Sequence, residues 1–464
     1  MSLIKSISGI RGTIGGKPGD NLTPIDILKF TASFISFIQE QQGKTNITAV
    51  IGRDARISGE MVNQLVCGTA LSMGCNIIDI GLSTTPTVEM EVVASGSDCG
   101  IIITASHNPS QWNALKLLNS RGEFINAEEG ETVLNKAEAG NYKFCEVGKI
   151  GKYAQVHDAI ERHIEKVLAL KLVDVDAIKN ANFKVAIDCV NSTGGIALPL
   201  LLKALGVEHI TQINCEPTGK FAHNPEPLPE NLTEISALLK KSDLDLGFVV
   251  DPDVDRLAII TENGEMFGEE YSLVSIADYV LTHTPGNTVS NLSSTRALRD
   301  VTEKFGQQYA ASAVGEVNVV AMMKETNAVI GGEGNGGIIY PELHYGRDSL
   351  VGIALFLTHL AKSGKSCSSL RSTYPNYSIS KNKIELSPEM NVDLILEKIQ
   401  EQYKKQPINT IDGVKIEFDK QWVHLRKSNT EPIIRIYCES ESLTTADYLA
   451  NKIISDIKEI VLNS

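Results

Sequence analysis

The chain has 464 residues, of which 42% are hydrophobic and 22% are charged, and its formal net charge is −14. This length is sufficient for about three or four domains of ordinary size. The acidic balance argues against non-specific binding to nucleic acid or to an anionic membrane surface. It leaves room for a local basic pocket that binds a small phosphorylated ligand.

The apolar stretches and the cysteines of the sequence bear on the compartment that we expect for the protein. The first residues contain no apolar core of signal-peptide length, and no uninterrupted apolar stretch is long enough to span a membrane. We therefore expect a cytoplasmic protein. The eight cysteines are scattered without a C-x-x-C pair, which disfavours a disulfide framework or a structural zinc site.

Strand and helix signals alternate through the first 150 residues. Thr23 and Pro24 begin an amphipathic run that extends to about Gln42, with threonine at the N-cap and proline at the first helical position. The segments that follow predict a strand over 49–54, a helix after Ser58, a strand over 76–80 and a helix beginning at 85–86. This βαβ series predicts a parallel or mixed sheet with right-handed crossovers.

A wholly apolar run, 100–103, ends abruptly in the polar sequence Thr-Ala-Ser-His-Asn-Pro over 104–109. A β-branched run without charge is typical of a strand covered on both faces, and ligands of open α/β sheets bind beyond the carboxyl ends of such strands. Ser106 and His107 are therefore expected where a substrate would lie. Taken alone, the segment favours a strand-to-helix turn whose Ser and Asn bond the local backbone.

A second series of strands and helices begins at about residue 183 and leads to the apolar strand 246–250, which ends in Asp-Pro-Asp-Val-Asp-Arg. Asp251, Asp253 and Asp255 concentrate negative charge directly after a buried strand, and such hard oxygen ligands suit Mg²⁺. An EF-hand loop is the chief alternative, because Glu262 occupies its twelfth position. Position six is Arg256 instead of glycine and the flanks read as strands, so the EF-hand is rejected.

A third series leads to Gly-Gly-Glu-Gly-Asn-Gly-Gly over 331–337, which places Glu333 and Asn335 on a glycine-rich backbone. A glutamate in the middle of the loop favours recognition of sugar hydroxyls over binding of phosphate. A plain glycine turn is the alternative for this segment alone.

The segment from about residue 368 departs from this alternation and predicts a smaller α+β domain. Its helices are expected near 392–403 and 444–461, and its strands near 413–418, 422–425 and 433–438. A basic, hydroxyl-rich loop lies before the last strand and offers a guanidinium and several neutral donors to a phosphate, although a basic surface turn has the same appearance. The candidate phosphate ligands are Arg426, Ser428, Asn429, Thr430 and Arg435.

In combination, these four loops resemble those of the α-D-phosphohexomutase superfamily, and the resemblance covers nearly the whole chain. It rests on the Thr-Ala-Ser-His-Asn-Pro loop, the aspartate loop, the Gly-Glu loop and the Arg-x-Ser-x-Thr-Glu-Pro loop, in this order. It implies an α/β fold of three related mixed-sheet domains and a smaller C-terminal α+β domain around a central cleft. The expected domains are a phosphoserine-loop domain over 1–150, a metal-binding domain over 151–256, a sugar-binding domain over 257–367 and a phosphate-binding domain over 368–464.

Carried over residue by residue, the resemblance assigns a role to each loop. Ser106 is expected to be phosphorylated and, with the three aspartates, to hold one Mg²⁺ per chain. Arg11, Arg256 and Lys116 are expected at the reacting phosphate, with Lys116 a candidate general acid/base if its pKa is lowered. His107, Glu333 and Asn335 would meet the substrate, and the five residues of the basic loop its other phosphate. The sequence departs from the family pattern at Pro252, Val254, Asn335 and Gly337, the last standing where several relatives have histidine.

The resemblance implies a mutase that moves a phosphoryl group between the 6- and 1-positions of a hexose phosphate through a hexose 1,6-bisphosphate, which serves as intermediate or activator. Glucosamine phosphate is the favoured substrate, with mannose or glucose phosphate as the alternative. A phosphatase and a non-catalytic sugar-phosphate sensor are the alternatives of other classes. The expected partner is a small-molecule sugar phosphate, with neither nucleic acid nor membrane, and the chain is expected to be a monomer or homodimer.

Overall fold

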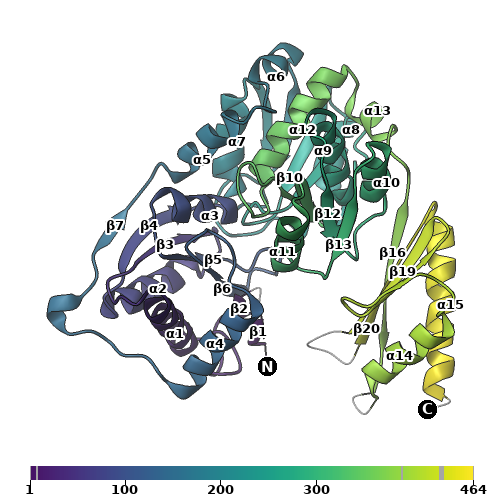
Figure 1. Cartoon of the computed structure of the whole chain (residues 1–464). Helices are drawn as coiled ribbons and strands as arrows, with labels where there is room; N and C mark the ends of the chain where they lie inside the picture. The colour runs from purple at the N-terminus through teal and green to yellow at the C-terminus, as the bar shows by residue number, and fades with distance from the viewer. Residues whose placement is uncertain (1, 7–8, 388–389, 428–432, 463–464) are drawn as a thin grey trace.

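The computed structural model describes residues 2–6, 9–387, 390–427 and 433–462. Three α/β domains follow one another along the chain, and a smaller C-terminal α+β domain stands to one side of them in Figure 1. This architecture confirms the expected fold class. Among the described residues, no helix is both long enough and apolar enough to cross a membrane.

The first domain is built on a seven-stranded sheet of order β1-β2-β6-β5-β3-β4-β7. Its strands are β1 (Ile4–Ser6), β2 (Gly9–Thr13), β3 (Thr48–Arg53), β4 (Asn76–Leu82), β5 (Cys99–Ile103), β6 (Trp112–Leu118) and β7 (Tyr153–Gln155). Its helices are α1 (Pro24–Gln42), α2 (Gly59–Ser72), α3 (Thr85–Ala94) and α4 (Ala127–Ala139). The expected cap of α1 is present, because the Thr23 hydroxyl accepts the Asp26 N–H while Asp26 accepts the Thr23 N–H.

The second and third domains each contain a four-stranded sheet, of order β11-β10-β8-β9 and β13-β12-β14-β15. The strands of the second are β8 (Lys184–Asp188), β9 (His209–Ile213), β10 (Leu246–Val250) and β11 (Leu257–Thr261). Those of the third are β12 (Thr288–Asn291), β13 (Tyr309–Ser312), β14 (Ile330–Glu333) and β15 (Gly337–Ile339). The helices over this part of the chain are α5 (Ala159–Leu168), α6 (Val175–Ala181), α7 (Gly194–Ala204), α8 (Thr233–Lys240), α9 (Glu269–His283), α10 (Ala297–Lys304), α11 (Glu316–Thr326), α12 (Ser349–Ser363) and α13 (Cys367–Arg371).

One topology recurs in the three α/β domains. In each, a first strand pairs in parallel with a second and a third, and the third then pairs with an antiparallel fourth: β3, β4, β5 and β6, then β8 to β11, then β12 to β15. The third and fourth strands therefore form a hairpin in every domain. The three hairpin loops occupy equivalent positions, which shows that the domains are related in structure.

The C-terminal domain has a five-stranded sheet of order β16-β20-β19-β18-β17 with two helices. Its elements are β16 (Ser378–Glu385), α14 (Val392–Gln402), β17 (Ile408–Asn409), β18 (Val414–Phe418), β19 (Gln421–Lys427), β20 (Ile433–Ser440) and α15 (Leu443–Leu462). Every neighbouring pair of strands is antiparallel. The neighbouring strands β19 and β20 carry Arg426 and Arg435, the two described residues of the basic segment singled out in the sequence.

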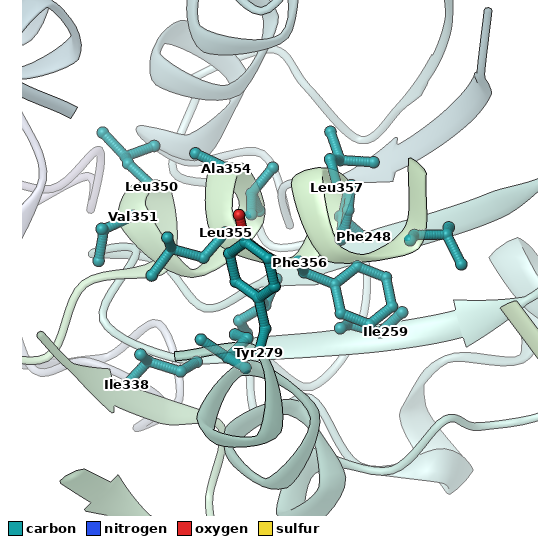
Figure 2. Close-up of a cluster of buried hydrophobic side chains, with 14 of the residues drawn as sticks. Phe248, Ile259, Tyr279, Ile338, Leu350, Val351, Ala354, Leu355, Phe356 and Leu357 are labelled. Atoms are coloured by element: carbon teal, nitrogen blue, oxygen red, sulfur yellow. The ribbon is translucent and has the colours of Figure 1, made fainter. Parts of the chain in front are cut away.

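Helix α12 joins the cores of the second and third domains. Its residues 349–358 are all buried, and it contacts helices α5, α6 and α7 as well as α9. Figure 2 shows Phe356 directed toward Phe248 and Ile259 of the second sheet, and the Phe248 and Phe356 rings lie edge to face at 6.1 Å. A helix that is apolar on all sides is expected in such a buried position, and it fixes the two domains against each other.

The boundary expected at residue 256 differs from the sheet boundary. Strand β11 pairs with β10 along its full length, from Val250↔Leu257 to Leu246↔Thr261, so the second sheet extends to Thr261. The reason is that the aspartate loop is the turn of a hairpin and its two strands belong to one sheet. The eight cysteines are free thiols, and six of them are buried.

Candidate active site

The hairpin loops of the three α/β domains meet at one place. The Ser106 hydroxyl, after β5, donates a 2.6 Å hydrogen bond to Asp251 Oδ2, after β10. The loop after β14 joins the same region, because the Leu257 N–H donates to the Gly336 carbonyl at 2.9 Å. The carboxyl ends of the third strands thus bring the serine, aspartate and glycine-rich loops together, as the sequence predicted for ligand-binding positions of α/β sheets.

Ser106 is held in an uncommon backbone conformation. Its φ is +47°, in the left-handed region that a residue with a side chain rarely adopts. The Ser106 N–H donates to the Thr104 hydroxyl at 2.9 Å, and Thr104 donates to Asp54 at 2.6 Å. Strain of this kind persists only where the surroundings impose it, and the resulting turn aims the hydroxyl at Asp251.

Arg56 anchors the backbone of the serine loop. Its fully buried guanidinium donates to the carbonyl groups of Ser106, Asn108, Pro109 and Trp112 at 2.5 to 3.0 Å. Its Nε donates to Asp54 at 3.0 Å, which balances the buried charge. Four carbonyl groups that would otherwise lack donors are therefore satisfied by one side chain.

The three aspartates form a buried cluster whose ligand atoms lie within 4.8 Å of one another, and none is exposed to solvent. Asp253 Oδ2 accepts from Lys116 and Thr85, and Asp255 Oδ2 accepts from Lys116 and Arg347. The Oδ1 atoms of Asp253 and Asp255 are buried without a hydrogen-bond partner among the described residues. This leaves one oxygen on each carboxylate for a cation, so the residues fit a Mg²⁺ ion.

The charges of the aspartates influence one another. Burial, together with the neighbouring Asp255 and Asp253, raises the pKa of Asp251 well above its usual range. Burial acts in the same direction on Asp255, but Arg347 and Lys116 outweigh it and lower the pKa of that carboxyl. A cation at the cluster would favour the charged form of all three carboxylates.

Lys116 on β6 reaches the cluster from the first domain. Its Nζ lies 2.7 Å from Asp253 Oδ2 and 3.3 Å from Asp255 Oδ2. Burial alone would lower the pKa of this lysine, but the two carboxylates raise it above its ordinary value. The sequence analysis expected Lys116 to act as an acid or base only if its pKa were lowered. In this arrangement its pKa is raised instead, and the ammonium form is favoured.

The charges of Arg11 and Arg256 act on His107, the residue next to Ser106. Burial and the nearby Arg256 lower the pKa of Arg11, which shows that the two guanidinium groups lie close enough to repel. Burial and Arg256 also lower the pKa of His107 to about 2, so the imidazole is neutral, and its Nδ1 lies 3.4 Å from Ser106 Oγ. Positive groups that repel one another around a serine hydroxyl make a suitable environment for a phosphate.

The glycine-rich loop places Glu333 and Asn335 in the same site. Glu333 Oε1 accepts from Asn291 and from the Gly315 N–H at 2.8 and 3.1 Å, and Oε2 accepts from Arg347 at 2.8 Å. Asn335 Oδ1 accepts the Gly337 N–H at 3.2 Å. Glu333 is thereby fixed by three donors, whereas the amide oxygen of Asn335 already serves its own loop.

Two residues of the expected phosphate clamp are described. Arg426 on β19 and Arg435 on β20 are directly paired across the hairpin, and Arg426 Nε lies 2.8 Å from Asp412. Like charges opposite each other on neighbouring strands destabilise a sheet, and an anion bound between them would relieve that repulsion. Ser428, Asn429 and Thr430 lie outside the described residues.

Comparison with known proteins decides the family. Models of the phosphoglucomutase/phosphomannomutase family match all four domains: α/β/α domain I over residues 3–144, domain II over 161–264, domain III over 269–377 and the C-terminal domain over 384–455. The chain belongs to the phosphoglucomutase/phosphomannomutase family.

Relatives within this family extend over nearly the whole chain. A protein of Thermococcus kodakarensis named phosphoglucomutase/phosphomannomutase is 35% identical and covers 93% of this chain and 94% of its own. A phosphoglucosamine/phosphogalactosamine mutase of Sulfurisphaera tokodaii is 32% identical over 99% of each chain. The crystal structure of a phosphoglucomutase/phosphomannomutase family protein from Burkholderia thailandensis superposes with a TM-score of 0.84 at 25% identity, covering 98% of each chain.

The sequence analysis did not identify two arginines that make contacts in the candidate active site, Arg56 and Arg347. Arg56 follows the apolar run of β3 closely, so its charge at the carboxyl end of a buried strand was a usable signal. Arg347 lies between β15 and α12, where no motif pointed to it. The one indirect signal in the sequence was Gly337, a residue without a side chain that leaves space for Arg347.

Proposed function

We propose that the protein is a phosphohexomutase that moves a phosphoryl group between the 6- and 1-positions of a hexose phosphate through phosphorylated Ser106. Membership of the family supports an intramolecular phosphotransferase. The observation that carries the proposal for this chain is the placement of the Ser106 hydroxyl 2.6 Å from Asp251, at the meeting point of three loops. The serine lies between a carboxylate cluster and a cationic group, which is the environment that phosphoryl transfer needs.

Mg²⁺ is the cofactor that this arrangement suits. Asp251 Oδ2 and the unpartnered Oδ1 atoms of Asp253 and Asp255 would hold the ion together with an oxygen on Ser106. When bound, Mg²⁺ supplies positive charge to the oxygens of the transferring phosphoryl group.

The protein groups around Ser106 would carry the remaining steps. As the bond from phosphorus to the Ser106 oxygen breaks, a bond from phosphorus to the oxygen of the free sugar hydroxyl forms. That hydroxyl gives up one proton and the Ser106 oxygen takes up one, so the transfer leaves the number of protons unchanged. Arg11 and Arg256 would stabilise the equatorial phosphoryl oxygens. Lys116 would keep its positive charge beside the phosphoryl group, because Asp253 and Asp255 raise its pKa. It remains the candidate general acid/base, but donating a proton to the departing Ser106 oxygen requires a lower pKa than this arrangement gives it.

The C-terminal domain would hold the phosphate that is not reacting. Arg426 and Arg435 provide two guanidinium groups on paired strands, and Ser428, Asn429 and Thr430 are expected to supply neutral donors to the same phosphate. The hexose 1,6-bisphosphate formed by the first transfer would turn over and return its other phosphoryl group to Ser106. Such a distant clamp fixes the orientation of the sugar, which is how positioning contributes to rate.

Glucosamine phosphate is the proposed substrate, and mannose or glucose phosphate the second candidate. Relatives in Methanopyrus kandleri and Sulfurisphaera tokodaii are named for phosphoglucosamine, whereas the Thermococcus relative is named for glucose and mannose phosphates. Asn335 can still accept a second hydrogen bond, here from the 2-amino group. One such contact is worth about 1 to 3 kcal/mol, roughly tenfold in specificity, and would bias the choice among sugars.

The test is a comparison of kcat/KM for glucosamine, mannose and glucose phosphates with one enzyme preparation. We expect isomerisation of all three, with glucosamine phosphate ahead. A clear lead for mannose or glucose phosphate would contradict the substrate and leave the mutase intact. Release of inorganic phosphate without isomerisation would indicate a phosphatase, and binding without turnover a sensor.

A further inference from the structure

Arg347 joins two loops that have different tasks. Its Nη2 donates to Asp255 Oδ2 of the aspartate loop at 2.6 Å, and its Nη1 donates to Glu333 Oε2 of the glycine-rich loop at 2.8 Å. Its Nε also lies 3.1 Å from Glu316 Oε2. The side chain is only 9% exposed, so one rigid guanidinium fork connects two buried carboxylates of the site in a fixed mutual geometry.

The space for this side chain exists because residue 337 is glycine. A Cβ atom added at Gly337 would lie 2.3 Å from Arg347 Cδ, closer than real Cβ atoms come, and would be tight against Arg347 Cγ at 3.0 Å and Asn335 Oδ1 at 3.1 Å. The φ of Gly337 lies outside the left-handed region, so its backbone does not by itself require glycine. The position of the Arg347 side chain therefore depends on the absence of a side chain at residue 337.

The backbone that carries Arg347 is firmly anchored at the junction of the three α/β domains. Asp348 caps helix α12 by accepting the Leu350 N–H, and its Oδ2 lies 2.9 and 3.2 Å from Nε2 of His163 and His344. This His-His-Asp set has the spacing of metal ligands, but both imidazole nitrogens already face the same carboxylate oxygen. We therefore interpret it as an anchor that leaves Arg347 little freedom to move.

We propose that Arg347 is a positioning residue of the mutase reaction, which holds Asp255 and Glu333 in one arrangement so that the metal end and the sugar end of the site form together. This inference rests on the proposed function, because it assigns both carboxylates to one reaction. Loss of the guanidinium leaves buried carboxylates without their shared partner, and such groups move or become protonated. The sugar contact then suffers even though Arg347 is not expected to touch the substrate.

Lysine cannot replace arginine in this role. An ammonium group is a compact point charge, whereas the two carboxylates are bound by two separate nitrogens of a planar fork. Arg347→Lys therefore keeps the charge and removes the bridge, which separates a positioning role from a purely electrostatic one.

The first experiment measures Arg347→Lys and Arg347→Ala in two ways: steady-state kinetics, and calorimetric binding of glucose 1-phosphate to the metal-free protein. We expect both variants to lose about tenfold or more in kcat/KM and to bind the sugar phosphate about fivefold more weakly. Added guanidinium chloride at millimolar concentration should restore part of both quantities to Arg347→Ala, whereas sodium chloride should not. Arg162→Lys is the matched control, because Arg162 makes a 2.6 Å interdomain ion pair with Glu91 outside the site.

The second experiment reaches Arg347 without changing it. Gly337→Ala must displace the guanidinium, so we expect it to reproduce the losses of Arg347→Lys. In the Arg347→Ala background the arginine side chain is gone, so Gly337→Ala has no guanidinium to displace. There the Gly337→Ala change should lower kcat/KM by less than about twofold. Such non-additivity is expected of two residues that share one interaction.

Three results would overturn the inference: wild-type kinetics and sugar affinity in Arg347→Lys, no rescue by guanidinium in a folded Arg347→Ala, or a full loss on adding Gly337→Ala to Arg347→Ala. Failure of the proposed function is distinct, since it would appear as a wild-type protein without mutase turnover. The binding arm still reports on Arg347 in that case.

Discussion

At the scale of single residues, the backbone conformation of Ser106 allows its hydroxyl to be removed without destabilising the loop. Its φ of +47° favours glycine over any residue with a side chain. Ser106→Gly therefore removes the hydroxyl and relieves the backbone, and we expect the melting temperature to be unchanged or higher while mutase activity is lost. The measurement pairs thermal unfolding with kcat, and intact-protein mass should show about one phosphate on wild-type Ser106.

Ser106→Ala provides the comparison. It also removes the hydroxyl but keeps a Cβ in the left-handed region, so it should be inactive and less stable than Ser106→Gly by about 1 kcal/mol. Substantial activity in either variant would show that another group accepts the phosphoryl.

The second prediction at this scale concerns the metal. Asp253→Asn removes one charged ligand while keeping the size of the side chain, and we expect Mg²⁺ affinity measured by calorimetry to fall at least about tenfold. Glu262→Gln is the matched control, because the Glu262 carboxylate is bound to Ser368 by two hydrogen bonds away from the cluster. Weaker Mg²⁺ binding in Glu262→Gln would instead revive the EF-hand reading, and unchanged binding in Asp253→Asn would remove the aspartate cluster as the site.

At the scale of elements, the serine loop depends on a residue outside it. Arg56→Met leaves four carbonyl groups without their donor and Asp54 without its buried cation. Removing one partner of a buried ion pair costs about 3 to 5 kcal/mol, so we expect a clear fall in the urea midpoint and loss of activity.

The control for this prediction is Arg121→Met, whose ion pair with Glu123 is largely exposed on the arginine side. An exposed pair contributes about 0 to 1 kcal/mol. If Arg56→Met lowered the free energy of unfolding no more than Arg121→Met, the prediction that Arg56 anchors the serine loop would be wrong.

Elements with strong local signals were predicted well. The helix expected from Pro24 to about Gln42 is α1, with the expected cap, and the strands expected at 246–250 and 257–260 are β10 and β11. Strand β13 and helix α11 were not predicted, because β13 is short and only half-buried and α11 has little apolar asymmetry. Helix α12, which is buried throughout 349–358, was not predicted either.

The site was predictable as far as it lies at strand ends. Ser106 and Asp251 were expected at the carboxyl ends of buried strands, and the repeated hairpin topology explains why they meet. Arg56 and Arg347 act through the space between domains, and their partners are distant in sequence. The raised pKa of Lys116 likewise depends on carboxylates of another domain, which no local pattern reveals.

At the scale of the whole molecule, a small set of polar contacts joins the C-terminal domain to the third domain. Arg299 forms a 2.7 Å ion pair with Glu417, and the buried Lys415 ammonium donates to the Leu292 carbonyl at 2.9 Å. His424 on β19 lies 2.9 Å from the Ser293 hydroxyl through Nδ1. Because the proposed phosphate clamp belongs to this domain, these contacts would set where the clamp stands relative to the serine loop.

His424 makes this junction sensitive to acid. Its Nε2 lies 2.7 Å from the Asp412 carbonyl, which can only accept, so Nε2 carries the proton and Nδ1 accepts from Ser293. Burial, with smaller contributions from Lys415 and Arg426, lowers the pKa of His424 to about 4 against the opposing effect of the Asp412 carbonyl and carboxylate. Protonation of Nδ1 would remove the acceptor for Ser293 and place a buried charge at the junction.

The sign of the pH dependence follows from this lowered pKa. The unfolded chain takes up a proton near the ordinary histidine pKa of about 6.5, whereas the folded chain takes it up only near 4. Stability due to neutral His424 is therefore complete above pH about 6.5 and falls between about 6.5 and 4, by up to about 3 kcal/mol. His424→Gln does not titrate, so its melting temperature should fall less than that of the wild type over this pH range. His157→Gln, at an exposed position, should follow the wild type. Parallel pH profiles for wild type and His424→Gln would show that His424 does not control the acid sensitivity of the junction.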